Sequence, residues 1–157
     1  MKINKTNAMR ILDSMNIIYD YIAYECDDGK IDGISVVHKT GQNPDSVFKT
    51  LVAVGHSKEL YVFCIPVEYE LNLKKAAKAS NEKNIEMLPL RDLTKYTGYI
   101  RGGCSPIGMK KQYKTFIDES AYLQDKISVS AGAIGMQIII SPDDFIKAAN
   151  AAFEDLI

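Results

Sequence analysis

A lysine interrupts a short apolar segment in the first third of the chain. Lys49 lies within residues 47–54, where Phe48, Leu51 and Val52 predict a largely buried strand. Removing an ammonium group from water is costly unless its charge is paired. The lysine therefore either directs its head into a cleft, where it would bind an anion or polarise a carbonyl, or extends it along the strand to solvent.

A glycine-rich segment, residues 99–108, is the second unusual stretch. Its adjacent Gly102 and Gly103 allow a ligand to approach the backbone closely and leave N–H groups to point at an oxyanion or phosphate, while Pro106 stiffens the loop. The segment lacks the Gly-x-x-x-x-Gly-Lys-Ser/Thr pattern of a P-loop. A purely structural turn is the alternative interpretation.

Ser130 ends a predicted β run and is followed by small residues, so its hydroxyl is expected beside open space. It lacks the Gly-x-Ser-x-Gly pattern, and no histidine or acid is visibly available to activate it. A hydrogen-bonding serine is therefore favoured over a nucleophile. Asp118 and Glu119 offer carboxylates, which a turn after a strand explains equally well.

The three cysteines are far apart and show neither C-x-x-C spacing nor a histidine at ligand spacing. We therefore expect no zinc site and no disulfide scaffold. We also expect no cofactor. Cys64 lies in an apolar run and predicts a buried thiol, whereas Cys104, in the glycine-rich loop, could be exposed. Neither His38 nor His56 has a visible reason to lie beside a cysteine, so a catalytic cysteine is disfavoured.

Composition indicates one globular domain over residues 1–157. The contents of 46% hydrophobic and 25% charged residues are globular averages, and no apolar run is long enough to span a membrane. Residues 1–5 show no apolar secretory core, so we expect a cytoplasmic protein.

The net charge of −1 argues against a stand-alone, charge-driven nucleic-acid binder. Two basic groups could form a lip for one nucleotide end or simply a solvated face: Lys74, Lys75 and Lys78, and Arg101, Lys110, Lys111 and Lys114.

Short helices alternating with hairpin-linked strands are expected to position these residues. Residues 47–54 and 59–66 predict a β-hairpin, and Thr6, Gly41 and Ser141 are expected at helix ends. Further strands are expected at residues 17–24, 113–118, 126–130 and 135–140, and helices at residues 9–15, 32–40, 71–80, 89–96 and from 142 onward. This order favours a mixed or antiparallel sheet over a doubly wound one.

Taken together and in order, the unusual segments resemble the YbaK/EbsC family of aminoacyl-tRNA deacylases. They comprise residues 47–51, the loop 98–108, and residues 116–120 with 129–132, and the resemblance extends from about Thr6 to Phe153. It implies an α/β (α+β) fold in which helices flank a mixed, mostly antiparallel, barrel-like sheet. The implied fold is related to the editing domain of bacterial prolyl-tRNA synthetases.

The reaction that this resemblance implies is trans-editing, the cleavage of the ester between a misattached amino acid and the 3′ adenosine of tRNA. Cys-tRNA(Pro) is the leading substrate and Cys-tRNA(Cys) a further one. In the implied mechanism the thiol of the substrate attacks its own ester and gives a cyclic thiolactone, which agrees with the lack of an activated nucleophile in this chain. The implied partners are tRNA and prolyl-tRNA synthetase, and the synthetase would supply much of the tRNA affinity.

The resemblance also assigns roles to residues. The family lysine falls on Lys49, which would hold the terminal phosphate or ribose near the ester. The family glycine loop falls on Gly102 and Gly103, whose N–H groups would face the carbonyl oxygen as it gains charge. The family serine falls on Ser130, which would contact the aminoacyl group. Four further substrate contacts are expected: Tyr24, Thr50, Pro106 and Asp118.

The chain departs from the family pattern near the expected mouth of the site. Ala133 and Ile134 stand where two basic residues are common, and Gln137 stands where an acidic residue is common. These changes remove local charge, so tRNA contact or amino-acid preference could differ. Two alternatives remain: a deacylase that activates water to clear another small amino acid, and a non-catalytic module that binds aminoacylated tRNA or a synthetase.

Overall fold

The computed structural model describes residues 4–157, in which eight strands form two sheets. The expectation about a secretory segment involves Met1–Ile3, which lie outside the described residues. One sheet is antiparallel and has the order β1 (Asp20–Ala23), β7 (Met136–Ile140), β6 (Ile127–Ser130). The other is mixed and has the order β4 (Ile85–Met87), β2 (Phe48–Gly55), β3 (Leu60–Pro66), β5 (Lys114–Asp118), β8 (Ala151–Glu154).

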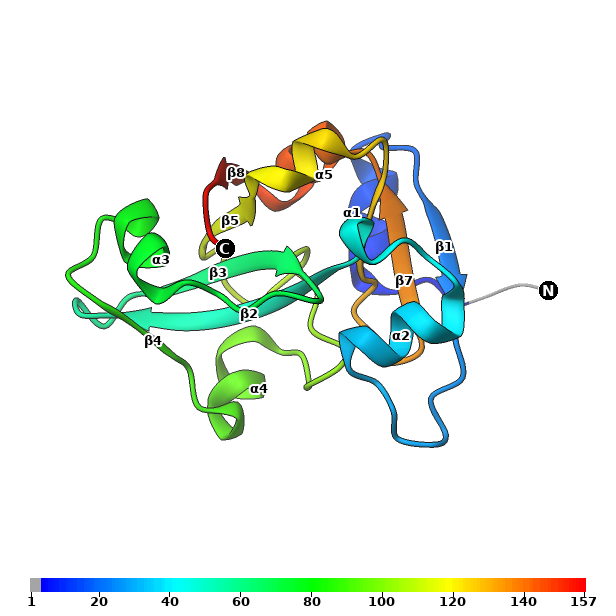
Figure 1. The fold of residues 1–157 in the computed structure, drawn as a ribbon. Helices are drawn as coiled ribbons and strands as arrows, with labels where there is room; N and C mark the ends of the chain where they lie inside the picture. Colours follow the sequence, from blue (N-terminus) through cyan, green and yellow to red (C-terminus); the bar gives the residue numbers. More distant parts are fainter. Residues whose placement is uncertain (1–3) are drawn as a thin grey trace.

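The pairing of the strands confirms the expected mixed, mostly antiparallel arrangement. The β3–β5 and β5–β8 pairs are parallel, and the other four pairs within residues 4–157 are antiparallel. An isolated parallel bridge joins Val47, the residue before β2, to Ser128 of β6, so the two sheets meet. The β2–β3 hairpin extends away from the part of the molecule built by β1, β7 and α2 (Gly33–Thr40) (Figure 1).

Capping side chains and left-handed residues end the helices as the sequence predicts. Thr6 caps α1 (Asn7–Ser14), and Ser141 accepts a hydrogen bond from the Asp144 backbone at the start of α5 (Pro142–Ala149). Gly41 ends α2 with a φ of 68°, a conformation that costs glycine little. The remaining helices are α3 (Leu73–Ser80) and α4 (Leu93–Thr97), with 3₁₀ turns at Pro44–Ser46, Leu90–Asp92 and Glu119–Leu123.

The predicted hairpin is confirmed and separates two hydrophobic clusters. Phe48 and Val52 point from one face of β2 into a cluster that includes Leu93 of α4. Ala53 points from the other face toward the stacked rings of Phe63 and Phe116, which α3 covers. The helices α3 and α4 accordingly lie on opposite sides of the hairpin (Figure 1). Strand β2 is thus held from both faces.

Two short strands were not predicted. β4 and β8 have three and four residues and take the two outer positions of the mixed sheet. Their pairing depends on long-range neighbours rather than on an alternating pattern of their own. Within residues 4–157, no helix is both long and apolar enough to cross a membrane.

Candidate functional site

A cleft of about 480 Å³ opens beside β2, near the meeting of the two sheets. Four of the predicted site residues line it: Lys49, Thr50, Gly102 and Ser130. They come from β2, from the loop after α4 and from the end of β6, and are brought together only by the fold. The other lining residues include Ile31, Asp32, Arg101, Cys104 and Gln137.

Two cations and one carboxylate set the charge of the cleft. Lys49 is half-buried, and among residues 4–157 its ammonium makes no ion pair or hydrogen bond. Arg101 is the one member of the two predicted basic groups that lines the cleft within the described part of the chain. Asp32 caps α2, and hydrogen bonds from the Ser35 hydroxyl (2.6 Å) and backbone N–H (3.2 Å) lower the pKa of its carboxyl group. The two cations outnumber the acid, which suits an anionic ligand.

Among residues 4–157, only one of the two glycine N–H groups, that of Gly102, lacks a hydrogen-bond partner. The Gly103 N–H donates to the Ile100 carbonyl oxygen at 3.0 Å, which closes a turn with Gly102 at a φ of 83°. A Cβ on Gly102 would lie 2.5 Å from the Ile31 side chain, and one on Gly103 would lie 3.1 Å from the Ile134 backbone nitrogen. The expectation that both N–H groups face an oxyanion is therefore corrected: Gly102 lines the cleft, whereas Gly103 shapes the turn.

Ser130 and Gln137 lie opposite each other on β6 and β7. The Ser130 hydroxyl oxygen accepts a hydrogen bond from the Gly132 N–H at 3.2 Å, so its own proton is available to a ligand. Gln137 is 7% exposed, and its side-chain oxygen has no hydrogen-bond partner among the described residues. A buried, unpartnered amide oxygen that lines a cleft is a ready acceptor for a ligand donor.

The two buried thiols, Cys64 and Cys104, are unsuited to nucleophilic attack. Cys104 is buried rather than exposed, and burial raises its pKa to about 11, while burial raises the pKa of Cys64 to about 12. Both are therefore protonated near neutral pH. His38 and His56 are exposed and are not among the lining residues. Within residues 4–157, no three His, Cys, Asp or Glu side chains gather in a way that could hold a metal ion.

Three predicted contact residues lie outside the cleft. Asp118 is 2% exposed, and its carboxylate accepts hydrogen bonds from the backbone N–H groups of Ser120 (3.1 Å) and Leu156 (2.9 Å). It therefore holds the C-terminal segment and does not reach the cleft. Pro106 is buried and Tyr24 half-buried, and neither is among the lining residues.

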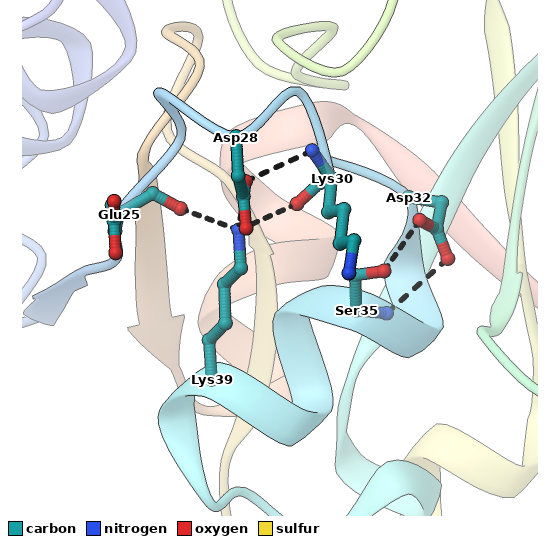
Figure 2. Close-up of polar contacts among 6 residues, drawn as sticks. All are labelled: Glu25, Asp28, Lys30, Asp32, Ser35 and Lys39. Atoms are coloured by element: carbon teal, nitrogen blue, oxygen red, sulfur yellow. Dashed lines mark hydrogen bonds and ion pairs between the residues drawn. The ribbon is translucent and has the colours of Figure 1, made fainter.

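A lysine outside the cleft orders one of its walls. Lys39 of α2 donates hydrogen bonds to the carbonyl oxygens of Glu25 (2.7 Å) and Lys30 (2.8 Å) and to the Asp28 carboxylate (2.7 Å) (Figure 2). These contacts hold together the loop of residues 25–30, and the residues that follow it, Ile31 and Asp32, line the cleft. Neither Lys39 nor Asp32 was predicted as part of the site, because only the Asp32 capping pattern is visible in sequence.

Comparison with known proteins identifies relatives of this chain. A family model described as the aminoacyl-tRNA editing domain matches residues 31–148. A protein of Enterococcus faecalis with the provisional name Cys-tRNA(Pro)/Cys-tRNA(Cys) deacylase EbsC is 44% identical over 152 residues, which cover 97% of this chain and 93% of the relative.

Solved structures of low sequence identity share the fold. One, provisionally described as a trans-editing enzyme for prolyl-tRNA synthetase, superposes with a TM-score of 0.81 at 17% identity and covers 98% of both chains. Another, the hypothetical protein APE2540, has a TM-score of 0.84 at 16% identity and covers 94% of this chain and 96% of its own. From the sequence match over most of its length, the chain belongs to the aminoacyl-tRNA editing domain family.

Proposed function

We propose that this protein hydrolyses Cys-tRNA(Pro), and secondarily Cys-tRNA(Cys), in trans. The observation that carries the proposal is a cleft with two cations, a free backbone N–H and a hydroxyl, but no activated nucleophile among its described lining residues. The relative with 44% identity carries this substrate pair in its name. The proposal implies action in the cytoplasm, where aminoacyl-tRNA is used, and cooperation with prolyl-tRNA synthetase.

The chemistry requires little from the protein beyond positioning and charge. The sulfur of the cysteinyl group forms a bond to its own carbonyl carbon, the carbon–oxygen bond to the ribose breaks, and the thiol proton passes to the ribose oxygen. The products are a cyclic thiolactone and tRNA with a free hydroxyl, and water then opens the thiolactone to give cysteine, so the net reaction is hydrolysis of the ester. In our proposal Lys49 and Arg101 hold the phosphate and ribose, the Gly102 N–H stabilises the carbonyl oxygen as it gains charge, and Ser130 orients the aminoacyl group.

A panel of esters on the same tRNA tests this proposal. We expect rapid hydrolysis of Cys-tRNA(Pro), and much slower hydrolysis of Ser-tRNA(Pro), in which a hydroxyl replaces the thiol, and of Ala-tRNA(Pro) and Pro-tRNA(Pro). Comparable rates for the cysteinyl and seryl esters would favour a water-activating deacylase. Hydrolysis of the alanyl ester alone would overturn the substrate assignment, and binding without turnover of any ester would favour a non-catalytic module.

A further inference from the structure

The positive charge of the chain is concentrated in residues 91–114. This segment holds six of the 19 lysines and arginines and one of the 20 acidic residues, so its formal charge is +5, whereas the rest of the chain carries −6. It includes α4 and the glycine-rich loop and ends at the first residue of β5. The net charge of −1 therefore conceals a strongly basic segment within a more acidic chain.

The cations of this segment are exposed and are not neutralised by neighbouring acids. The exposed fraction is high for all six: Arg91, Lys95, Arg101, Lys110, Lys111 and Lys114. The ion pairs within residues 4–157 are made by other lysines, namely Lys5, Lys39 and Lys75. Exposed cations without a partner carboxylate raise the local concentration of anionic ligands.

Contacts between α4 and the end of the loop bring three of these lysines onto one surface. The Lys110 ammonium donates to the Lys95 carbonyl oxygen at 3.4 Å, and the Tyr113 hydroxyl donates to the Tyr96 carbonyl oxygen at 2.8 Å. The ammonium groups of Lys95 and Lys111 lie 5.1 and 5.9 Å from the ring centres of Tyr96 and Tyr113. We call this surface, formed by Lys95, Lys110 and Lys111, the basic strip.

The same segment leads from the basic strip into the cleft. Arg101 follows Lys95 by six residues and lines the cleft. By contrast, the loop of residues 25–32, which contributes Asp32 to the cleft lining, contains four acidic residues and one lysine. Because one side attracts phosphates and the other repels them, a polyanion whose end lies in the cleft should leave it over the basic strip.

A nucleic-acid backbone fits this surface better than a protein does. Lysine is depleted in protein–protein interfaces, whereas it is a regular contact to the phosphates of nucleic acids. We propose that the basic strip binds phosphates of the tRNA acceptor arm, next to the 3′ end. The inference rests on the proposed function, because it takes the aminoacylated end of tRNA as the occupant of the cleft. The protein thereby has tRNA affinity of its own, in addition to what a synthetase would supply.

Two triple variants that lose the same charge test the proposal. The strip variant carries Lys95→Gln, Lys110→Gln and Lys111→Gln. The control variant carries Lys74→Gln, Lys78→Gln and Lys83→Gln, on or just after α3, which lies across the hairpin from α4 (Figure 1). The control lysines are also exposed and make no ion pair among the described residues. Both variants should therefore fold, which thermal unfolding checks.

Binding of uncharged tRNA(Pro), without synthetase, is measured by fluorescence anisotropy over a range of salt concentrations. At about 0.1 M salt the strip variant should bind at least about tenfold more weakly than the wild type, and its slope of log affinity against log salt should be shallower by about two. The control variant should match the wild type. Equal weakening in both variants, or wild-type affinity and slope in the strip variant, would overturn the proposal. A strip variant that keeps its tRNA affinity but no longer binds prolyl-tRNA synthetase would also overturn it and assign the strip to a protein partner.

Hydrolysis distinguishes this proposal from the proposed function. In the strip variant the KM for Cys-tRNA(Pro) should rise, whereas hydrolysis of 3′-O-cysteinyl adenosine 5′-phosphate, which lacks the rest of the acceptor arm, should be unchanged. Weaker tRNA binding by the strip variant alone, with no hydrolysis by the wild type, contradicts the proposed function and supports the strip. Hydrolysis with the same KM in both variants supports the function and contradicts the strip.

Discussion

Ser130 and Gln137 are register partners in the β6–β7 ladder, and both residues line the same cleft. Ser130 offers a proton, whereas the buried oxygen of Gln137 offers an acceptor that no described residue uses. The pair thus presents a donor and an acceptor side by side to one ligand. We therefore propose Gln137 as a further substrate contact beside Ser130.

Gln137→Met should weaken substrate binding without weakening the fold. Methionine has a similar length and removes an unpartnered buried polar group, so the free energy of unfolding should stay the same or rise. The KM for Cys-tRNA(Pro) should rise about tenfold, the effect of losing one hydrogen bond in a desolvated site. Steady-state kinetics and thermal unfolding measure the two effects, and an unchanged KM would show that the amide does not contact substrate.

Lys49→Met should abolish most of the activity. The lysine has no partner among the described residues, so its charge is available to the substrate and contributes little to stability. We expect kcat/KM to fall about 100-fold, in the range seen when one charge-stabilising donor is removed. Lys83→Met, on an exposed residue outside the cleft, changes the net charge equally and serves as the control. Equal activities of the two variants would remove Lys49 from the mechanism.

Lys39→Met should loosen a cleft wall without touching the substrate. Three hydrogen bonds to the loop at Glu25, Asp28 and Lys30 would be lost (Figure 2). We expect faster amide hydrogen exchange in residues 26–31 and a several-fold lower kcat/KM. Lys30→Met is the matched control, because the loop uses the backbone of Lys30 and not its ammonium. Unchanged exchange would contradict the role of Lys39.

The same cluster predicts a pH dependence of loop order. The hydrogen bond from Lys39 and the Lys30 backbone N–H lower the pKa of the Asp28 carboxyl group below its usual value of 3.8. The ionised carboxylate therefore stabilises the folded loop at neutral pH, and this contribution is lost as the pH falls below that value toward the folded pKa. The protection factors of the loop amides, which correct the exchange rate for its intrinsic pH dependence, should fall in acid in the wild-type protein and change less in Lys39→Met.

Asp118→Ala should destabilise the protein and leave its kcat/KM almost unchanged. The variant leaves two backbone N–H groups, of Ser120 and Leu156, without their acceptor. We expect a loss of about 3 kcal/mol in the free energy of unfolding in urea, since each bond is made to a carboxylate in a buried setting. The kcat/KM of the folded fraction should stay within about twofold of the wild-type value. A selective rise in KM would restore Asp118 as a substrate contact.

Cys104 should react slowly with iodoacetamide in the native protein. Burial raises its pKa to about 11, so the thiolate fraction at pH 7.5 is very small and increases as the pH rises. Cys26, which is partly exposed, should be modified first. Mass spectrometry of the labelled peptides measures both rates, and rapid labelling of Cys104 at neutral pH would reopen the case for a catalytic thiol.

Local chemistry made much of the fold predictable. The β2–β3 hairpin, the Thr6 and Ser141 caps and the end of α2 at Gly41 each depend on nearby residues. β4 and β8 were not predictable in this way, because they are short and owe their conformation to the strands beside them. Long-range packing likewise buries Cys104 in the cluster that contains Phe48.

The sequence predicted several residues that line the cleft, but it did not predict how their hydrogen-bonding groups are arranged. Lys49, Gly102 and Ser130 line one cleft, although they are far apart in sequence. That Gly103 donates to Ile100 depends on the conformation of the turn, which the sequence Gly-Gly leaves open. Lys39 joins the site through a loop that it does not neighbour in sequence, so no local pattern could have indicated it.

The two hydrophobic clusters that hold β2 limit how far the cleft can change shape around a ligand. Lys49 and Thr50 are consecutive residues, so their Cα atoms are about 3.8 Å apart whatever the ligand. Phe48 and Val52 are packed in one cluster and Ala53 in the other. Close packing on both faces therefore keeps this strand rigid. In our proposal the single-stranded end of the tRNA therefore has to adjust to the protein when the two bind.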